Sequence, residues 1–557
     1  TIAVVAVFLP VIFLEGLTGR LFREFGLVVA SAVAISSFVS LTLTPMMSSK
    51  LLKRRAVQPW LYRKTEPFFK NLSASYGRLL HGFMRKRWLA FIIIFVSGVL
   101  IYLLMGFIPS ELAPMEDRSE FRFQAQAPEG ATFEYMDGYV TAMYDFIEQE
   151  VPEVHGVLSI TSPSFGGGGA NSGFLKVMLK DPSQRTRSQQ EIVDDLTPKA
   201  KRFTGVRTFI SQSQTIGDRR GGFPVQIVVQ AADIDKLKAA LPQFIEKANE
   251  SPKFTFVDLD LKFNKPEINI VINRDKARNL GVNVIDISQT LQLGLSGSRF
   301  GNFIMDGKQY QIIGQVEKKN RNEPLDLKTL YVRNRRGEII QLDNLVTVEE
   351  QSSPPQLYRF NRYSSAKISA QPAPGVALAE GIAEMEKIAG QVLDDTYSTS
   401  LSGASREFAE SSSSIYLAFL LALAIIYLVL AGQFESFKDP LIIMFTVPLA
   451  LSGALISLWY TNQTMNIFSQ IGIIMLIGLV TKNGILIVEF ANQRKEQGLK
   501  VMDAVIGAAE SRFRPIIMTS MSTILGILPI ALALGAGSES RVSMGIAIIG
   551  GMLFATL

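Results

Sequence analysis

The sequence contains no cysteine and only two histidines among its 557 residues. The missing thiols exclude a disulfide framework, an iron–sulfur cluster and any thiolate metal site, and His81 and His155 are too few for an all-imidazole zinc site. Charge is also scarce, because 19% of residues are charged whereas 48% are hydrophobic. This composition is too apolar for an ordinary soluble enzyme and predicts a membrane protein. The chain opens with Thr1 inside an apolar run, which we interpret as a fragment.

Motifs for nucleotide hydrolysis and for hydrolytic catalysis are absent as well. No GxxxxGK[ST] loop, HExxH or GxSxG occurs, so we expect neither an ATPase nor a hydrolase. The net charge of +6 reflects cations beside apolar segments, and a nucleic-acid partner is not required to explain it. If the protein transports a substrate, an ion gradient or a partner must provide the energy.

Apolar stretches near the length of a membrane span recur along the chain. A spanning helix needs about 20 residues, so the first and last stretches are expected to be truncated spans. The eight predicted segments are 1–15, 26–47, 88–108, 414–432, 440–460, 466–490, 514–534 and 542–557.

The distribution of cations predicts the orientation. Residues 48–87 contain eleven lysines and arginines but one acid, Glu66, so this connection should be cytoplasmic. The long segment 109–411 then lies outside. Within the basic connection, 59–86 has apolar residues at helical spacing and is predicted to be an amphipathic helix on the inner membrane surface.

The long external segment alternates predicted strands and helices. The strand and helix order over 117–220 is that of a split βαβ fold, and it begins again at 221–275 and resumes at 360–405. Between these parts, 276–359 is rich in turns, with Asp306-Gly307 marking a hairpin. The predicted fold class is a polytopic α-helical membrane protein with a large α+β insert of two split βαβ subdomains plus a β-rich module.

Lys482 is the strongest single functional candidate. It lies eight residues, about 12 Å, from Phe490 in an apolar helix, which is deeper than a snorkelling side chain reaches easily. An intramembrane ammonium is costly and normally functional, although a lysine that snorkels or loses its proton remains an alternative. The chain has no central intramembrane acid to pair with it, so we expect that partner in sequence outside this chain.

The next apolar segment contains a second polar pattern. Arg512 and Thr519 are seven residues apart and share one helix face, whereas Arg514 points elsewhere. We interpret the pair as part of a polar track with Lys482; ordinary positive-inside anchoring is the alternative.

A glycine-rich loop in the insert is the third candidate. Phe165 precedes four consecutive glycines (Gly166, Gly167, Gly168 and Gly169) and Asn171 in a loop between two predicted strands. Such a backbone is highly mobile, and Phe165 is placed to contact an apolar ligand. A plain flexible hairpin loop explains the same residues.

Taken together, these segments resemble the resistance-nodulation-division (RND) transporters, specifically the proton-driven hydrophobe/amphiphile multidrug efflux pumps. The resemblance covers essentially the whole chain. The motifs that carry it are Gly16–Phe25, Leu43-Thr-Pro45, Gly478–Phe490, Arg514–Ser520 and Gly535-Ala-Gly537. It implies that the chain runs from within the fifth to within the twelfth transmembrane helix of such a pump.

The resemblance also implies roles. Lys482, Arg512 and Thr519 match proton-relay residues whose acidic partners lie on a helix in a missing N-terminal half. The loop from Phe165 to Asn171 matches the switch loop between drug pockets, and Lys176 stands where many such pumps have a pocket phenylalanine.

The implied protein is a secondary active transporter in the inner membrane of a Gram-negative bacterium, with its insert in the periplasm. It would use the proton gradient and no cofactor, and would act as a homotrimer with a periplasmic adaptor and an outer-membrane channel. The α/β subdomains would be porter subdomains and 276–359 a docking module. Two alternatives are a heavy-metal RND exporter, which lacks a lysine at this position, and a non-transporting RND-like receptor or translocase accessory.

Overall fold

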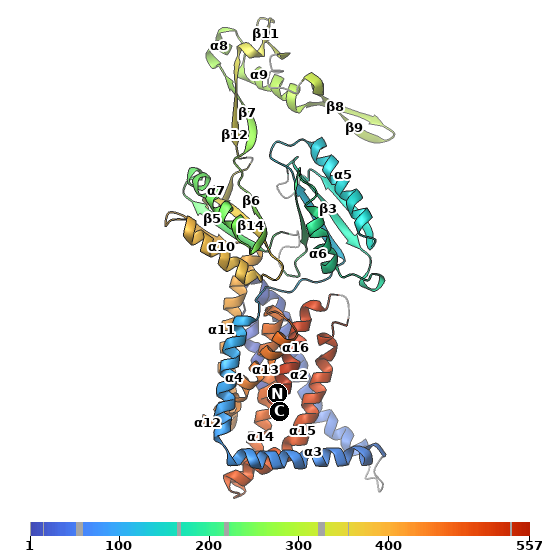
Figure 1. Cartoon of the computed structure of the whole chain (residues 1–557), viewed down its shortest axis with the longest axis vertical. Coiled ribbons are helices and arrows are strands. Elements are labelled where there is room, and N and C mark those ends of the chain that lie inside the picture. The colour runs from blue at the N-terminus through green and yellow to red at the C-terminus, as the bar shows by residue number, and fades with distance from the viewer. Residues whose placement is uncertain are drawn as a thin grey trace. The chain divides into compact units, whose positions relative to one another are not determined.

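The computed structural model of the chain describes residues 2–14, 16–51, 60–163, 169–216, 222–320, 329–354, 356–534 and 537–556. These residues form two compact units. The first unit comprises Thr1–Ala127, Phe133–Asp260 and Arg359–Leu557, and the second comprises Pro128–Thr132 and Leu261–Tyr358. The first unit contains a helical bundle and two α/β subdomains (Figure 1).

Apolar helices build the bundle. They are α1 (Ile2–Ile12), α2 (Gly16–Leu51), α4 (Trp88–Phe107), α11 (Gly403–Phe434), α12 (Lys438–Met444), α13 (Thr446–Tyr460), α14 (Ile467–Glu496), α15 (Val501–Ala531) and α16 (Glu539–Thr556). In the described part of the chain, six stretches are long and apolar enough to cross a membrane, counting α12 and α13 together. The first and last predicted segments correspond to α1 and α16, which are not among the six.

Small and branched side chains fill the centre of the bundle. Leu104 of α4, Leu458 of α13, Leu476 of α14 and Ile548 of α16 are buried in one cluster. Side chains on the outside of α4 remain exposed and apolar, as Phe95 illustrates at 72% exposure. Apolar surface of this kind is stable in hydrocarbon but not in water, which agrees with membrane insertion.

Helix α15 differs from its sequence prediction. It begins at Val501, whereas the apolar run suggested a start near residue 514. Pro515 therefore lies inside the helix and not at its opening, and Arg512 lies in its middle turns. A proline within a membrane helix is tolerated where neighbouring helices and hydroxyl groups satisfy the freed backbone.

A separate amphipathic helix, α3 (Trp60–Arg85), lies within the basic connection. Its Phe68 and Leu79 side chains are 64% and 74% exposed, whereas Gly77 on another face is buried. One face of α3 thus packs on the protein, and a second apolar face is left open.

The first α/β subdomain has the element order β-α-β-β-α-β. Its elements are β1 (Glu120–Gln126), α5 (Phe133–Glu150), β2 (Val154–Thr161), β3 (Ser172–Leu179), α6 (Gln189–Ala200) and β4 (Arg207–Gln212). The antiparallel sheet has the order β2-β3-β1-β4. Because side chains alternate along a strand, Phe121 and Phe123 of β1 face the core with Leu175 and Val177 of β3.

The second α/β subdomain is built around a fully buried strand. Its elements are β5 (Val225–Ala231), α7 (Ile234–Glu250), β6 (Phe254–Leu259), β13 (Tyr358–Phe360), β14 (Tyr363–Pro372), α10 (Leu378–Val392) and β15 (Ser398–Leu401). The sheet runs β13-β14-β5-β15, and β6 also pairs with β14. Every residue of β5 is buried, which suits a central strand.

The second unit has its own small core. Its elements are β7 (Lys265–Ile272), α8 (Arg274–Asn279), α9 (Val284–Leu291), β8 (Ser298–Met305), β9 (Lys308–Gly314), β10 (Tyr331–Arg333), β11 (Ile339–Gln341) and β12 (Val346–Ser353). The predicted hairpin at Asp306-Gly307 joins β8 to β9, and both residues have positive φ.

One strand pairs differently from the sequence prediction. Strand β7, which the periodicity assigned to the second α/β subdomain, instead forms an antiparallel ladder with β12, with Ile272 opposite Val346. The predicted boundary at residue 276 therefore lies inside this unit, which begins at Leu261. A period of two specifies which face a strand buries but does not specify its partner.

Candidate functional site

Helix α14 carries Lys482 near its middle and is closely surrounded by other helices. Gly472 lies against the backbone of Met544 in α16, and a Cβ at this position would approach the Met544 carbonyl oxygen to 3.0 Å. Gly478 meets Val7 of α1 in the same way, and Gly484 meets Ile443 of α12. Small residues at these spacings allow helices to approach closely in a membrane.

Lys482 lies between two buried polar residues. Thr481 is completely buried and donates its hydroxyl to the Ile477 carbonyl at 2.9 Å. The Asn483 amide, also buried, donates to Ser520 Oγ of α15 at 3.4 Å. Lys482 itself is exposed, and among the described residues it forms no hydrogen bond or ion pair. Lys482 therefore projects outward from the helices of this chain, because successive residues point about 100° apart on a helix.

Arg512 of α15 lies beside α14. Its guanidinium carbon is 4.5 Å from the centre of the Phe490 ring, in cation–π geometry. Its Nε atom is buried and has no hydrogen-bond partner in the described structure. A buried N–H without a partner is costly, so this arginine is poised to bind a further acceptor.

Thr519 lies two turns beyond Arg512, and its hydroxyl donates to the Ile516 carbonyl at 3.0 Å. The adjacent Ser520 is the residue that binds Asn483. The structure thus joins α14 and α15 through Asn483 and Ser520, whereas no hydrogen bond between Lys482 and Thr519 is found among the described residues.

Arg514 points toward α3, and its partner is the one acid of the basic connection. The Arg514 Nη2 donates to Glu66 Oε2 at 2.8 Å, and its guanidinium lies 4.9 Å from the Phe69 ring. One residue earlier, Phe513 stacks on Tyr76 with the ring centres 4.1 Å apart. Burial, together with the neighbouring charge of Glu510, raises the pKa of Tyr76. The two arginines of α15 therefore contact different helices.

Only part of the predicted glycine loop is described. Phe165, Gly166, Gly167 and Gly168 lie outside the described residues. Gly169 lies so near Asn171 that a Cβ would come within 2.8 Å of the Asn171 Oδ1. Asn171 is buried, and its amide donates to the Ala127 carbonyl at 3.1 Å.

Lys176 lies on the face of β3 away from the subdomain core. Its ammonium is 2.7 Å from Glu120 Oε2 of β1, in a half-exposed ion pair. The Phe209, Phe223 and Phe256 rings form a cluster between the two α/β subdomains, with centres 4.8 to 5.0 Å apart. Sequence reasoning missed this cluster because Phe209 lies in β4, Phe256 lies in β6 and Phe223 lies in the segment before β5.

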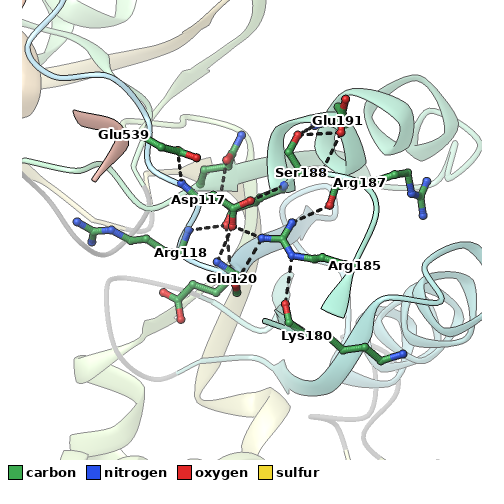
Figure 2. Close-up of polar contacts among 12 residues, drawn as sticks. Asp117, Arg118, Glu120, Lys180, Arg185, Arg187, Ser188, Glu191 and Glu539 are labelled. Atoms are coloured by element: carbon green, nitrogen blue, oxygen red, sulfur yellow. Dashed lines mark hydrogen bonds and ion pairs between the residues drawn. The ribbon is translucent and has the colours of Figure 1, made fainter. Parts of the chain in front are cut away.

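A polar cluster at the base of the first α/β subdomain was also missed. The Arg185 side chain is 1% exposed and donates to Asp117, and to the carbonyls of Lys180 and Arg187 at 3.1 and 2.9 Å (Figure 2). Burial alone would raise the pKa of Asp117, but the hydrogen bonds from Arg185 and from the backbone of Gln189 and Ser119 lower it overall. This cluster fixes the segment that enters β1.

No group of three or more histidine, aspartate or glutamate residues placed to hold a metal occurs in the described ranges. The arrangement thus offers an intramembrane cation, hydroxyl and amide groups, and an arginine with a free donor.

Comparison with known sequences identifies the family. The sequence model of the AcrB/AcrD/AcrF family matches residues 1–557, the whole chain. The chain belongs to this family of RND efflux transporters.

Named relatives agree with this assignment. The chain is 35% identical over 569 residues to an uncharacterized transporter of Haemophilus influenzae, covering 100% of this chain and 54% of that protein. It is 31% identical over 570 residues to the multidrug/solvent efflux pump membrane transporter MepB of Pseudomonas putida, covering 99% and 54%. The toluene efflux pump membrane transporter TtgB of Pseudomonas putida matches to the same extent. The chain therefore spans about half the length of these curated relatives.

Proposed function

We propose that this chain is part of a proton-driven efflux transporter that exports hydrophobic or amphiphilic compounds from the inner membrane. Family membership supports efflux, and the observation that carries the proton drive is Lys482. Its ammonium projects from a closely packed spanning helix without a partner among the described residues. An unpaired intramembrane cation is costly unless another group neutralises it, so we infer an acidic partner outside this chain.

In this mechanism, a proton on the acidic partner weakens its attraction to Lys482. Helix α14 then shifts relative to α15, and Asn483 and Ser520 connect the two helices. Arg512 and Thr519 complete the polar track, with the free Nε donor of Arg512 available to a carboxylate or water. The two α/β subdomains serve as porter subdomains, opening and closing a substrate path by alternating access.

The substrate path includes the loop from Phe165 to Asn171 as its switch. Because position 176 is a lysine, the neighbouring surface is less aromatic, and the ion pair with Glu120 neutralises part of the charge of Lys176. We further propose a homotrimer with its insert in the periplasm, where the second unit docks to an adaptor protein and an outer-membrane channel. The heavy-metal alternative is not favoured, because the named relatives export drugs and solvents.

Replacing Lys482 by alanine in the intact transporter tests the proton drive. The change removes a charge but little packing, because the side chain is exposed. We expect efflux to be abolished while the assembly remains intact by size-exclusion chromatography. Wild-type export by Lys482→Ala at equal membrane abundance would contradict the relay role, and Lys438→Ala, on an exposed residue of α12, is the matched control.

A further inference from the structure

The segment 109–119, which connects α4 to β1, binds the beginning of α14. Met465 N–H donates to the Pro109 carbonyl at 2.8 Å, and the Glu111 N–H donates to the Met465 carbonyl at 3.1 Å. The Ile467 N–H, in the first turn of α14, donates to the Leu112 carbonyl at 3.3 Å. This connecting segment is therefore attached to the helix that carries Lys482.

The same connecting segment also binds both α/β subdomains and α16. Its Ser110 carbonyl accepts a hydrogen bond from Ala379 of α10 at 3.3 Å. Its Asp117 joins the Arg185 cluster of the first subdomain, and the Asp117 N–H donates to Glu539 of α16 at 3.0 Å. If α14 moves relative to the subdomains, these hydrogen bonds must either transmit the movement or break.

Glu111 is the ionisable group at this junction. The Thr464 hydroxyl donates to Glu111 Oε1 at 2.5 Å. Burial raises the pKa of Glu111, and the hydrogen bond from Thr464 offsets this only in part. The docked position therefore favours the neutral carboxyl more than water does, because ionisation there lacks a compensating charge.

The charged groups on the elements around Glu111 do not pair with it. Glu380 lies in the first turn of α10, and Glu539 and Arg541 lie at the start of α16. Glu539 instead accepts from Asp117, and in the described structure none of the three forms an ion pair or hydrogen bond with Glu111. The state of Glu111 therefore depends on its access to solvent and on Thr464.

A buried polar chain leads from Glu111 into the bundle. Asn466 Nδ2 donates to Thr464 Oγ1 at 3.0 Å, and Ser543 Oγ of α16 donates to Asn466 Oδ1 at 3.1 Å. Asn466 N–H donates to Ser469 Oγ at 2.8 Å. Asn466, Ser469 and Ser543 are all completely buried. Buried polar groups in a helical bundle are costly unless joined, and here they connect Glu111 to α14 and α16.

We propose that Glu111 is a second protonation site of the transport cycle, which binds and releases a proton from the outer solution and thereby docks or releases the connecting segment at the start of α14. In the neutral form the carboxyl keeps its contact with Thr464 and remains buried. In the ionised form the carboxylate gains free energy from hydration, so the segment opens at this end. This inference rests on the proposed proton-driven function. It adds a protonation site at Glu111, on the side of the membrane opposite the cytoplasmic connection.

The test compares three variants of the intact transporter in proteoliposomes. Glu111→Gln keeps the shape and the acceptor oxygen of the neutral acid but cannot ionise. Glu380→Gln removes an exposed acid beside the same segment and serves as the matched control. We expect the efflux rate to depend less steeply on external pH in Glu111→Gln, because only the acidic partner of Lys482 then responds to it, while Glu380→Gln keeps the wild-type profile.

Infrared difference spectroscopy of the carboxyl band provides a readout that is independent of transport. Wild-type protein should show a protonated carboxyl that Glu111→Gln lacks. Thr464→Val removes the bond that stabilises the ionised form, so this band should persist to higher pH in that variant. Misfolding would not remove the band in Glu111→Gln and also extend it to higher pH in Thr464→Val, so the two variants together report on the titration of Glu111.

Loss of the band together with a shallower pH response in Glu111→Gln supports the second site. A wild-type pH profile in Glu111→Gln, or a band unchanged by the substitution, overturns it. If wild-type efflux does not depend on the proton gradient, the proposed function is wrong. The infrared carboxyl band then shows independently whether Glu111 is protonated.

Discussion

Replacing Arg514 by alanine should release the surface helix α3 from α15. The substitution removes the ion pair with Glu66, whose side chain is 15% exposed, and the contact with the Phe69 ring. The Arg514 side chain is 40% exposed, so solvent screens part of the attraction. The Tyr76 and Phe513 stack remains, so α3 should still form its other contact.

The size of the effect follows from these contacts. A partly exposed ion pair contributes up to about 1 kcal/mol. A cation–π contact at such a site contributes about 0.5–1 kcal/mol. The sum is about 0.5–2 kcal/mol, and about 1.4 kcal/mol corresponds to a tenfold change in an equilibrium constant. We therefore expect the population with α3 undocked to rise roughly tenfold.

Hydrogen–deuterium exchange of the intact transporter in nanodiscs measures this population. Amides of α3 should exchange about tenfold faster in Arg514→Ala than in the wild type, if exchange occurs from the undocked state. Arg63→Ala removes another exposed cation of the same helix without touching this contact, and should leave exchange unchanged. Equal exchange in Arg514→Ala and wild type, or equal acceleration by Arg63→Ala, would refute the docking role.

Four further predictions concern other parts of the chain. Arg512→Ala should reduce proton-coupled efflux at normal membrane abundance, whereas Arg514→Ala should largely retain it; equal losses would exclude a track on one helix face. Arg185→Met should destabilise the first α/β subdomain by about 3 kcal/mol, because Asp117 loses its buried partner, and denaturant melts with circular dichroism would measure this. The pKa of Asp117 is lowered in the folded state, so its contribution to the free energy of unfolding is complete above its unfolded pKa of about 4 and is lost as the pH falls through its folded pKa. Lowering the pH through this range should therefore reduce the free energy of unfolding less in Arg185→Met than in wild type. Proline at 167 and 168 should impair efflux of large substrates more than of small ones, and equal loss for all sizes would indicate misfolding.

Local patterns in the sequence were sufficient to predict the membrane helices and to identify the candidate cations. A long apolar run must become a helix in hydrocarbon, because every backbone group needs a partner there. Lys482 was identified because an ammonium in such a run is costly, and helical periodicity placed Arg512 and Thr519 on one face of α15 and Arg514 on another. The contacts of these arginines with Phe490 and with Glu66 agree with that spacing.

Tertiary structure alone decided the pairings. Glu66 and Arg514 are 448 residues apart, and no local pattern links them. Strand β7 joined β12 because strand periodicity selects a buried face but leaves the partner open. No local pattern singles out Glu111, and its junction with Thr464 arises only when the segment after α4 meets the turn before α14. The sequence by itself determined which segments are apolar enough to enter the membrane, since that depends on local transfer free energy, while the fold determined which polar groups meet, since that depends on contacts between distant segments.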